Sequence, residues 1–534
     1  MKKKLIVNGL IYDGLGNEPF KGSIYIEDDV IKEVIHGEKG IEDCKEYEKI
    51  DASGMVITPG FVDIHRHCDM KPFFGTDFGK VILAQGITTT VVGNCGFSMV
   101  PVPKDPQDAY EMFQFAEPVM GPGFCGIDTY QEYREGLDNA KLPVNIASMI
   151  GTGTVKIAVK GFSDTPFTKE EMEKASFYIE DALSRGAVGV SAGIMYIPEC
   201  YNSTEDYARL LAPMGRYNVP LCVHIRGEGD SLVKSVKEVI SIGKAVGCPV
   251  EISHFKSCGM KNWRASIHEA IKLIEEAREK GQDVTCDFYP YEGGSTSLTT
   301  MIPPTFVSGD MKAALQRLGT PEGVKEFSDS LKITYYDWDN YAITLGWNRI
   351  LISGVSKEHN RKYLGKMVDE ATKEYGFENA EAFVADLLHD EDGNVAIINM
   401  SMCQDDIDTI ARLPYSNVIS DSIYCETDTP HPRLYGAFPK FLREYVRERQ
   451  IFSMEEAVKK ITSLPAKRMN IKKRGQITEG YYADLNIFDV EEFTDQATFE
   501  QPSQLARGLH KCYINGELAW EKEAMVSDNC GKNL

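Results

Sequence analysis

From Gly60 onward the sequence alternates strand-like and helix-like segments. Short apolar runs are followed by amphipathic stretches of helix length, an order typical of βα units around a parallel sheet. Eight strand candidates can be placed in the 534-residue chain, at residues 61–65, 88–92, 145–150, 186–190, 220–224, 250–254, 284–289 and 417–420. Eight parallel strands suit a closed barrel. The sequence therefore predicts an α/β fold built on a TIM-type (β/α)₈ barrel.

The clearest helices between these strands lie at residues 169–184, 231–246 and 264–280. Apolar residues recur there at every third or fourth position, so they share one helix face. Each segment is followed by a glycine that favours helix termination, namely Gly186, Gly247 and Gly281.

The two ends of the chain have a different residue pattern from the central part. Short β-branched runs occur at residues 5–7 and 23–26, and similar runs return after Ser463 at residues 475–477 and 483–488. Such runs between Gly and Asp turns read as small antiparallel strands. We expect both ends to pair into one small β-sandwich domain beside the barrel.

Two stretches are too long for an ordinary βα connection. One runs from about residue 101 to 128 and the other from about 296 to 388. Insertions at the carboxyl ends of barrel strands lie beside the active site and often serve as lids. The expected division is 1–58 for the first part of the sandwich, 59–295 for barrel strands 1–7, 296–388 for the lid insertion and return helices, 389–462 for the strand 8 region, and 463–534 for the second part of the sandwich and the tail.

Composition and charge narrow the possible functions. The net charge of −22 repels nucleic acid and anionic membranes, and no Lys/Arg stripe offsets it. The apolar run after the basic start is cut short by Asn8 and Gly9, and no segment approaches a membrane span. The 13 cysteines follow no disulfide framework. We therefore expect a cytoplasmic protein with a small-molecule partner, and the sequence leaves homo-oligomerisation open.

Histidines recur at the predicted strand ends. His65 and His67 alternate on the first strand, so both imidazoles point to one side, and His224 and His254 close two later strands. A single His-x-His arises by composition about as often as by function, but four of only 10 histidines at matching places indicate a metal site.

Cys95 and Asp421 complete the candidate ligand set. Zn²⁺ accepts imidazole, thiolate and carboxylate, so further ligands should lie at other strand ends. Cys95 follows a β-branched strand between Gly93 and Gly96, whereas most other cysteines read as inert core residues. Asp421 follows the last strand, where an ordinary turn residue is the alternative interpretation.

The motifs around these residues resemble a known family. In chain order they are GFVDIHRHCD, GNCGFSMVP, HIRGEGD, ISHFKSCG, DFYPYEGGST, SDS and HPRLYGAFPKFLREY. This series resembles the N-acyl-D-amino-acid deacylases (D-aminoacylases) of the amidohydrolase superfamily over nearly the whole chain. GNCG, HIRxEGD and HPRxYGxF are specific to that branch, whereas the closing segment from ITSLPAKR to ADLNIFD is similar to the tail of many amidohydrolases.

The resemblance implies two zinc positions that share one ligand. The ligands of a tightly bound zinc would be Cys95, His224 and His254. A second, weaker position would use His65 and His67, with Cys95 bridging and Asp421 nearby. Hydantoinase-like relatives instead bridge two metals with a carboxylated lysine on the fourth strand, where this chain has AVGVSAG.

Two segments depart from the family pattern. Gly151-Thr152-Gly153 stands where these deacylases commonly have Gly-His-Gly, and the loop after the fourth strand reads Tyr196-Ile-Pro-Glu199-Cys, where they have Tyr-x-Pro-Gly. Both segments lie close to the predicted site. These departures affect the prediction of the substrate more than the prediction of the reaction chemistry.

We expect zinc-dependent hydrolysis of a linear amide. Asp421 would take a proton from the attacking water and return it to the departing amine. Lys256 and Arg433 would bind one substrate carboxylate together with the phenol of Tyr289 or Tyr291, and the sequence leaves the choice of tyrosine open.

The expected substrate is an N-acyl-D-amino acid with a neutral or apolar side chain, and the preference for D substrates comes from the resemblance alone. The stretch 292–311 contains no Lys or Arg, while Leu298, Met301, Ile302, Pro303 and Phe306 offer apolar contacts, unless they are merely lid core. The alternatives are a cyclic amide or ureide hydrolase, like hydantoinases and dihydroorotases, and a non-catalytic barrel scaffold.

Overall fold

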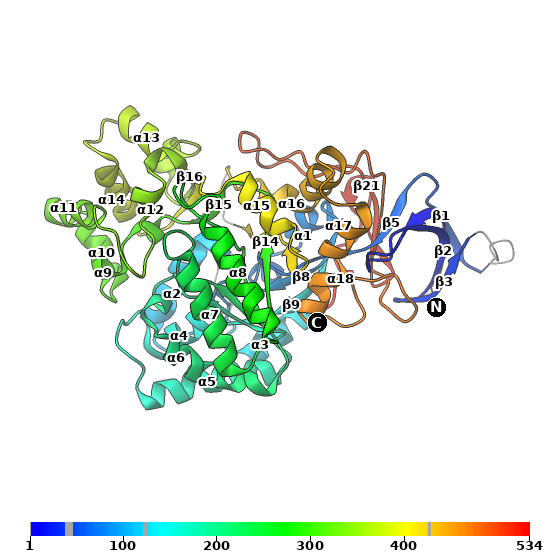
Figure 1. Ribbon diagram of the computed structural model, residues 1–534, viewed down its shortest axis with the longest axis horizontal. Coiled ribbons are helices and arrows are strands. Elements are labelled where there is room, and N and C mark those ends of the chain that lie inside the picture. The colour runs from blue at the N-terminus through cyan, green and yellow to red at the C-terminus, as the bar shows by residue number, and fades with distance from the viewer. Residues whose placement is uncertain (1, 38–45, 121–125, 425–428) are drawn as a thin grey trace.

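The structure is a computed structural model that describes residues 2–37, 46–120, 126–424 and 429–534 (Figure 1). Its central part is an α/β body. The strands nearest the N-terminus lie at one end of the long axis, and helices α9 to α14 lie at the other (Figure 1). The observed architecture is therefore of the predicted α/β class.

The strands of the central body are parallel and occur in three groups. β6, β8 and β9 pair in that order, β10, β11, β12, β13, β14 and β18 form a second run, and β19 pairs with β7. Their bounds are Phe61–Asp63 for β6, Arg66–His67 for β7, Ile87–Val92 for β8, Asn145–Ser148 for β9, Ile150–Gly151 for β10, Val190–Gly193 for β11, Leu221–His224 for β12, Val250–Ile252 for β13, Val284–Phe288 for β14, Ser416–Val418 for β18 and Ser422–Ile423 for β19. Buried side chains fill these strands on both faces, as parallel sheets require.

The fourth predicted strand was misplaced. It begins at Val190 and ends at Gly193, whereas the sequence predicted residues 186–190. Gly186 has φ +96° and the amide of Ala187 still bonds to Ala182 O, so residues 186–189 are used to leave the preceding helix. The other seven predicted strands overlap observed ones.

The predicted helices are confirmed with small shifts at their ends. α5 covers Lys169–Ser184, α7 Leu232–Val246 and α8 Ser266–Glu279. α5 begins with a capping box between Thr168 and Glu171, and α7 ends at Gly247 in the left-handed conformation. Both are local signals that are visible in the sequence.

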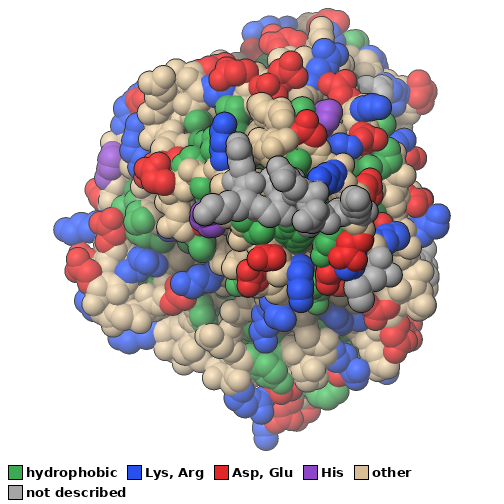
Figure 2. Space-filling view, turned by 90° about the vertical axis from the view of Figure 1, so that its right-hand side faces the viewer, with side chains coloured by type: hydrophobic (Ala, Val, Ile, Leu, Met, Phe, Trp, Pro, Cys, Tyr) green, Lys and Arg blue, Asp and Glu red, His purple; other side chains and the backbone are tan. Residues whose placement is uncertain are grey.

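A second sheet contains both ends of the chain. Its strand order is β23-β22-β21-β20-β5-β1-β2-β3, with β4 paired to β1. The strands are β1 Lys3–Ile11, β2 Phe20–Glu27, β3 Val30–His36, β4 Glu48–Asp51, β5 Val56–Pro59, β20 Leu485–Phe488, β21 Leu509–Ile514, β22 Glu517–Glu521 and β23 Ala524–Met525. The predicted strand at 475–477 is absent, because Gly475 has φ +77° and lies in a turn. Figure 2 shows the face at this end of the molecule, where acidic and basic side chains are intermixed.

The segment expected to form a lid has its own sheet and its own core. β15 (Gly294–Ser297), β16 (Ile350–Val355) and β17 (Val395–Asn399) pair antiparallel in the order β15-β17-β16. The helices between them are α9 Pro304–Val307, α10 Met311–Leu318, α11 Pro321–Ser330, α12 Tyr341–Thr344, α13 Val368–Glu374 and α14 Ala380–Asp390. This sheet extends beyond residues 296–388, so β17 belongs to the insertion rather than to the strand 8 region.

The shorter insertion, around residues 101–128, contains helix α2 (Pro106–Met120), and residues 121–125 of that prediction lie outside the described part. Among the described residues, no helix combines the length and the apolarity that crossing a bilayer requires.

Candidate metal centre

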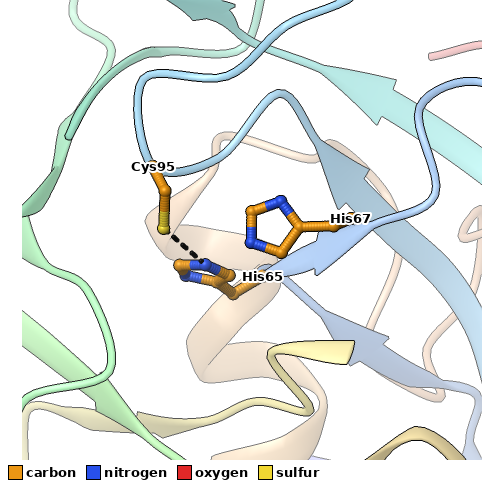
Figure 3. A group of neighbouring side chains, drawn as sticks. All are labelled: His65, His67 and Cys95. Atoms are coloured by element: carbon orange, nitrogen blue, oxygen red, sulfur yellow. Dashed lines mark hydrogen bonds between the residues drawn. The ribbon is translucent and has the colours of Figure 1, made fainter. Parts of the chain in front are cut away.

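His65 and His67 lie at the carboxyl end of the first parallel strand. His65 follows β6 and His67 ends β7, and both side chains are buried. Their ring centroids are 5.3 Å apart, and both rings point toward Cys95 (Figure 3). The alternation of side chains along a strand therefore places the two imidazoles on one side, as predicted.

Cys95 lies in a tight loop that follows β8. Its φ is +55°, and Gly93 and Gly96 on either side also have positive φ. The amide of Gly96 donates to the Ser191 hydroxyl at 3.0 Å, which fixes the loop against β11. The Cys95 Sγ atom lies 3.2 Å from His65 Nε2 and 3.3 Å from His254 Nε2. The thiol thus stands between two of the strand-end histidines.

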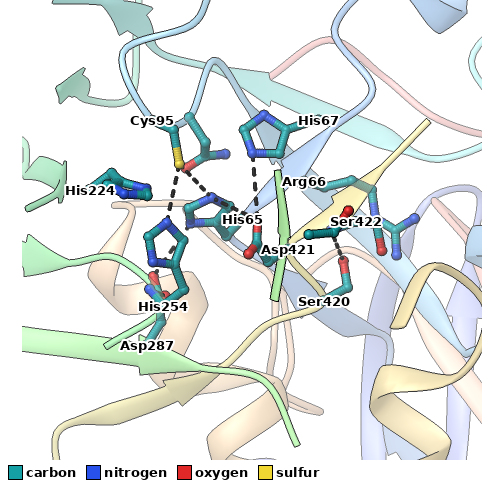
Figure 4. Close-up of polar contacts among 12 residues, drawn as sticks. His65, Arg66, His67, Cys95, His224, His254, Asp287, Ser420, Asp421 and Ser422 are labelled. Carbon is teal, nitrogen blue, oxygen red and sulfur yellow. Dashed lines mark hydrogen bonds and ion pairs between the residues drawn. The ribbon is translucent and has the colours of Figure 1, made fainter. Parts of the chain in front are cut away.

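His224 ends β12, and His254 follows β13 by two residues. Their ring centroids are 4.5 Å apart. With the first strand and Cys95 they form two groups of potential metal ligands, His65-His67-Cys95 and Cys95-His224-His254, and the ligand atoms of each group lie within 4.8 Å of one another. Figure 4 shows Cys95 between the two groups. The structure therefore brings together the predicted ligands.

These side chains fit a zinc ion in their chemistry and in their spacing. His224 Nε2 is buried without a hydrogen-bond partner among the described atoms, which is costly unless another group satisfies it. Burial lowers the pKa of His224 to about 3, so its imidazole is neutral as a metal ligand must be. Zinc bonds sulfur at about 2.3 Å and nitrogen at about 2.0–2.1 Å, which separates S and N by about 3.6 Å in a tetrahedral site. The Cys95 to His254 distance of 3.3 Å is close to that value.

Asp421 lies between β18 and β19 with φ +47°, and its amide donates to His65 O. Its Oδ1 is 3.4 Å from His65 Nε2 and 3.5 Å from His67 Nε2, while Oδ2 is 2.8 Å from Arg433 Nη1. Burial alone would raise the pKa of Asp421, but Arg433 and His65 hold it well below its usual range. The group is therefore a carboxylate directed at the histidine cluster.

Both predicted cations are buried and already face an acidic group. Lys256 Nζ lies 2.6 Å from Glu228 Oε1, and Arg433 pairs with Asp421. Arg433 retains a buried Nε without a hydrogen-bond partner among the described atoms. Tyr289 lies beside both, with its ring centroid 4.5 Å from the Arg433 guanidinium and 5.9 Å from Lys256 Nζ. The structure thus groups one tyrosine with the two cations.

Tyr291 is placed elsewhere. Its ring stacks edge-on against His431 at 5.3 Å and faces Phe499 at 6.4 Å, and its hydroxyl is buried without a hydrogen-bond partner among the described atoms. It does not line the cavity described next, whereas Tyr289 does. The geometry therefore separates the two tyrosines that the sequence could not distinguish.

A small cavity borders His67, His224 and His254. Its walls also include Cys95, Glu228, Lys256, Tyr289 and Asp421, and four apolar side chains, Phe97, Val119, Met195 and Ile423. The apolar lid residues considered from the sequence do not line this cavity, and four of them belong to the buried core of the lid: Leu298, Met301, Ile302 and Phe306. Here the packing interpretation is correct. Those side chains share one buried apolar cluster with residues of α10, α11 and α14.

Three residues near the histidines were missed by the sequence reasoning. Glu228 contacts His254 and Lys256, Asp287 accepts from the amide of His254, and the hydroxyl of Tyr196 lies 3.4 Å from His224 Nδ1. Glu228 lies inside the HIRGEGD motif, and Asp287 interrupts an apolar buried strand, which is a readable signal for a buried polar role. Tyr196 begins a segment that was expected close to the site, but its contact with His224 was not predicted.

The two departures from the family pattern contact each other. The Thr152 hydroxyl donates to Glu199 Oε1, and the amide of Gly193 donates to Glu199 Oε2 at 2.7 Å. An added Cβ at Gly96 or Gly153 would collide with the same carboxyl group. Glu199 therefore lies against the Cys95 loop and joins the ends of β10 and β11.

Comparison with known proteins identifies the relatives of this chain. Residues 396–519 match the model of the amidohydrolase family. The D-aminoacylase of Alcaligenes xylosoxydans xylosoxydans is 29% identical over 99% of this chain and 97% of its own length. The N-acyl-D-aspartate deacylase of the same organism is 30% identical over 91% of this chain and 86% of its own length.

A solved structure covers the entire chain. The N-acyl-D-glutamate deacylase from Bordetella bronchiseptica, complexed with zinc and a phosphonate inhibitor that mimics the tetrahedral intermediate of its reaction, superposes with a TM-score of 0.84 at 27% identity and covers 100% of both chains. Together with the full-length relatives, this match shows that the chain belongs to the D-aminoacylase (N-acyl-D-amino-acid deacylase) family of amidohydrolases.

Proposed function

We propose that this chain is a zinc-dependent hydrolase that cleaves the linear amide of N-acyl-D-amino acids to a carboxylate and a free D-amino acid. The observation that carries the proposal is the pair of ligand groups that share Cys95 at the carboxyl ends of parallel strands, with Asp421 beside them. Full-length relatives that are named for this chemistry support it.

Cys95, His224 and His254 would hold the tightly bound zinc. His65 and His67, with Cys95 bridging and Asp421 nearby, would form the second position. When bound, zinc would lower the pKa of a water molecule to about 7 and polarise the substrate carbonyl. Burial lowers the pKa of His65, His224 and His254, which favours their neutral, ligating form.

Asp421 would move the proton. Its Oδ1 faces the histidine cluster, where the attacking water would stand, and its Oδ2 is anchored by Arg433. The carboxylate can take the proton of the water and deliver it to the amide nitrogen, which leaves only after protonation. The buried ion pair with Arg433 keeps the carboxylate charged and fixes its orientation.

Lys256, Arg433 and Tyr289 would bind the substrate carboxylate. Lys256 and Tyr289 line the cavity, and Arg433 offers the unpartnered Nε. A guanidinium, an ammonium and a phenol are all donors to a carboxylate. Each cation would exchange part of its contact with Glu228 or Asp421 for the substrate.

A neutral substrate side chain fits the walls of the cavity. Lys256 is the one cation among the described residues that line it, and Glu228 already neutralises that charge. The apolar wall is formed by Phe97, Met195 and Ile423, with Val119 on α2. An acidic side chain would be buried there without a partner of its own, at a cost of several kcal/mol.

The cyclic-amide alternative lacks structural support. A carboxylated lysine on the fourth strand would be needed to bridge two metals as in hydantoinases, and β11 contains only Val190, Ser191, Ala192 and Gly193. The scaffold alternative would require lost ligands, and every predicted ligand is present and close to its partners.

The strand pairings suggest the finer architecture. The strands follow one another in the order β6/β7, β8, β9/β10, β11, β12, β13, β14 and β18/β19, and β19 pairs with β7 again. This is the connectivity of a closed (β/α)₈ barrel. The terminal sheet would curl into a β-sandwich around one apolar cluster that includes Ile6, Ile24, Ile57 and Ile487. We keep the predicted boundaries at 58/59 and 462/463 as a proposal, and we extend the lid insertion from residues 296–388 to 294–399, so that it includes β15 and β17. The free thiols of the ten described cysteines suit the cytoplasm.

A substrate panel tests the proposal. kcat/KM is measured for N-acetyl-D-methionine and N-acetyl-D-leucine, for N-acetyl-D-aspartate and N-acetyl-D-glutamate, and for a hydantoin. The neutral D substrates should be preferred, and the methyl ester of the best substrate should react far more slowly at its amide. Preference for the acidic substrates, an ester that reacts as well as the acid, or faster opening of the hydantoin would contradict the assignment.

A further inference from the structure

Glu228 contacts a candidate zinc ligand and a candidate substrate-binding cation at the same time. Its Oε1 lies 3.1 Å from His254 Nδ1 and 2.6 Å from Lys256 Nζ. The side chain is buried, and the ammonium of Lys256 is the positive charge beside it. Glu228 therefore contacts an imidazole and an ammonium group from a buried position.

The contacts of His254 restrict its tautomer. Its Nε2 faces Cys95 Sγ at 3.3 Å, on the side of the predicted zinc. An imidazole that binds a metal through Nε2 carries its proton on Nδ1, so Nδ1 must donate a hydrogen bond. A tautomer with the proton on Nε2 could not use that atom as a ligand.

The two neighbours of Nδ1 favour opposite tautomers. Lys256 Nζ lies 2.7 Å from Nδ1 and has only donors, so it favours an unprotonated Nδ1. Glu228 has only acceptors when ionised, so it favours a protonated Nδ1. Of these two groups, only Glu228 can partner the metal-binding form.

We propose that Glu228 is a positioning residue that selects the metal-binding tautomer of His254 against Lys256. When Nδ1 carries the proton, the ammonium of Lys256 must move away from Nδ1 while it keeps its contact with Glu228. The cavity borders Lys256, so this movement turns the ammonium toward the place of the substrate carboxylate. This last step rests on the proposed function, whereas the selection of the tautomer does not.

The test is the zinc affinity of apo protein, measured by competition with a chromophoric chelator at fixed pH and without substrate. Glu228→Met removes the acceptor and should weaken zinc binding by about 10–100-fold, the usual effect of losing a carboxylate behind a ligating histidine. Glu228→Gln keeps an acceptor oxygen and should restore part of that loss. Lys256→Met removes the competing donor, so its zinc affinity should equal or exceed that of the wild type.

Glu238→Gln is the matched control. Glu238 pairs with Arg226 of the same HIRGEGD segment at 2.9 Å and has no described contact with His254. The zinc affinity of the Glu238→Gln protein should equal that of the wild type. Circular dichroism and thermal unfolding of each variant separate a folding defect from a loss of zinc affinity, and Glu228→Gln serves as the measured variant if Glu228→Met does not fold.

Two results would overturn the inference. One is a Glu228→Met protein that binds zinc as tightly as the wild type. If Glu228→Met does not fold, the same result for a folded Glu228→Gln protein counts instead. The other is a Lys256→Met protein that loses zinc as strongly as the Glu228 variant. Because zinc binding is read without substrate, a failure of the substrate assignment leaves this test interpretable.

Discussion

Replacement of Asp421 by Asn tests the proposed chemistry most selectively. The two side chains have nearly the same size, so the packing between β18 and β19 is kept. An amide cannot take a proton from water and return it to the leaving amine. Asp421 also lies outside the Cys95-His224-His254 group. We therefore expect a folded protein that keeps the tight zinc and loses turnover.

The contacts of Asp421 determine how much the substitution should lower the rate and how much it should lower the stability. Loss of general acid–base help typically costs 10²–10⁴-fold in rate, or about 3–5 kcal/mol of transition-state stabilisation. The variant also leaves Arg433 with a neutral partner at 2.8 Å in a buried site. Breaking a buried ion pair costs about 3–5 kcal/mol of stability. The rate and the stability of the variant must therefore be measured separately.

The assay follows the release of free amino acid from N-acetyl-D-methionine, with zinc content and thermal unfolding determined on the same sample. Asp484→Asn is the matched control, because Asp484 forms a buried ion pair with Arg474 and has no described contact with the histidines. This control should lose stability but keep kcat. An Asp421→Asn enzyme with kcat within a few-fold of the wild type would refute the proton-transfer role.

Three further predictions follow from the same structure. Cys95→Ala should lose the tight zinc and activity together, as measured by metal analysis; full zinc content would refute the ligand assignment. Tyr289→Phe should raise KM for the free acid substrate, whereas Tyr291→Phe should leave KM near the wild-type value; the reverse order would contradict the grouping with Arg433. Burial lowers the pKa of Lys156 to about 8 from 10.5, so between these pH values the folded chain has released a proton that the unfolded chain keeps. The free energy of unfolding of the wild type, relative to that of Lys156→Met, should therefore rise by about 3 kcal/mol between pH 8 and pH 10.5. Chemical unfolding at several pH values measures this difference, and a flat difference would contradict it.

The structure brings the predicted ligand residues together, whereas it keeps the predicted apolar lid residues away from the cavity. His65, His67, His224 and His254 could be placed because parallel strands direct their carboxyl ends to one side, so that equal positions on different strands converge. Cys95 carried a local signal, since the glycines beside it permit the positive φ of the loop. These are rules of geometry that need no knowledge of tertiary packing.

The errors have a common physical cause. The fourth strand was misplaced because the apolar run at 186–190 satisfies both a helix-ending turn and a strand, and only the tertiary packing decides between them. The apolar lid residues, such as Leu298 and Phe306, were compatible with a pocket wall and with a core, and they proved to be core. Glu228 was missed because its two partners lie on a different strand end, and a single sequence does not pair residues across strands.

The most direct test of the central claim compares metal-free and zinc-restored protein on one pair of enantiomers. Both preparations are incubated with N-acetyl-D-methionine and N-acetyl-L-methionine, and free methionine is quantified together with zinc per chain. The account predicts that the zinc-restored protein releases D-methionine, that the L enantiomer reacts far more slowly, and that the metal-free protein is inactive. Equal activity without zinc, or a zinc-loaded protein that leaves the D substrate intact, would contradict it.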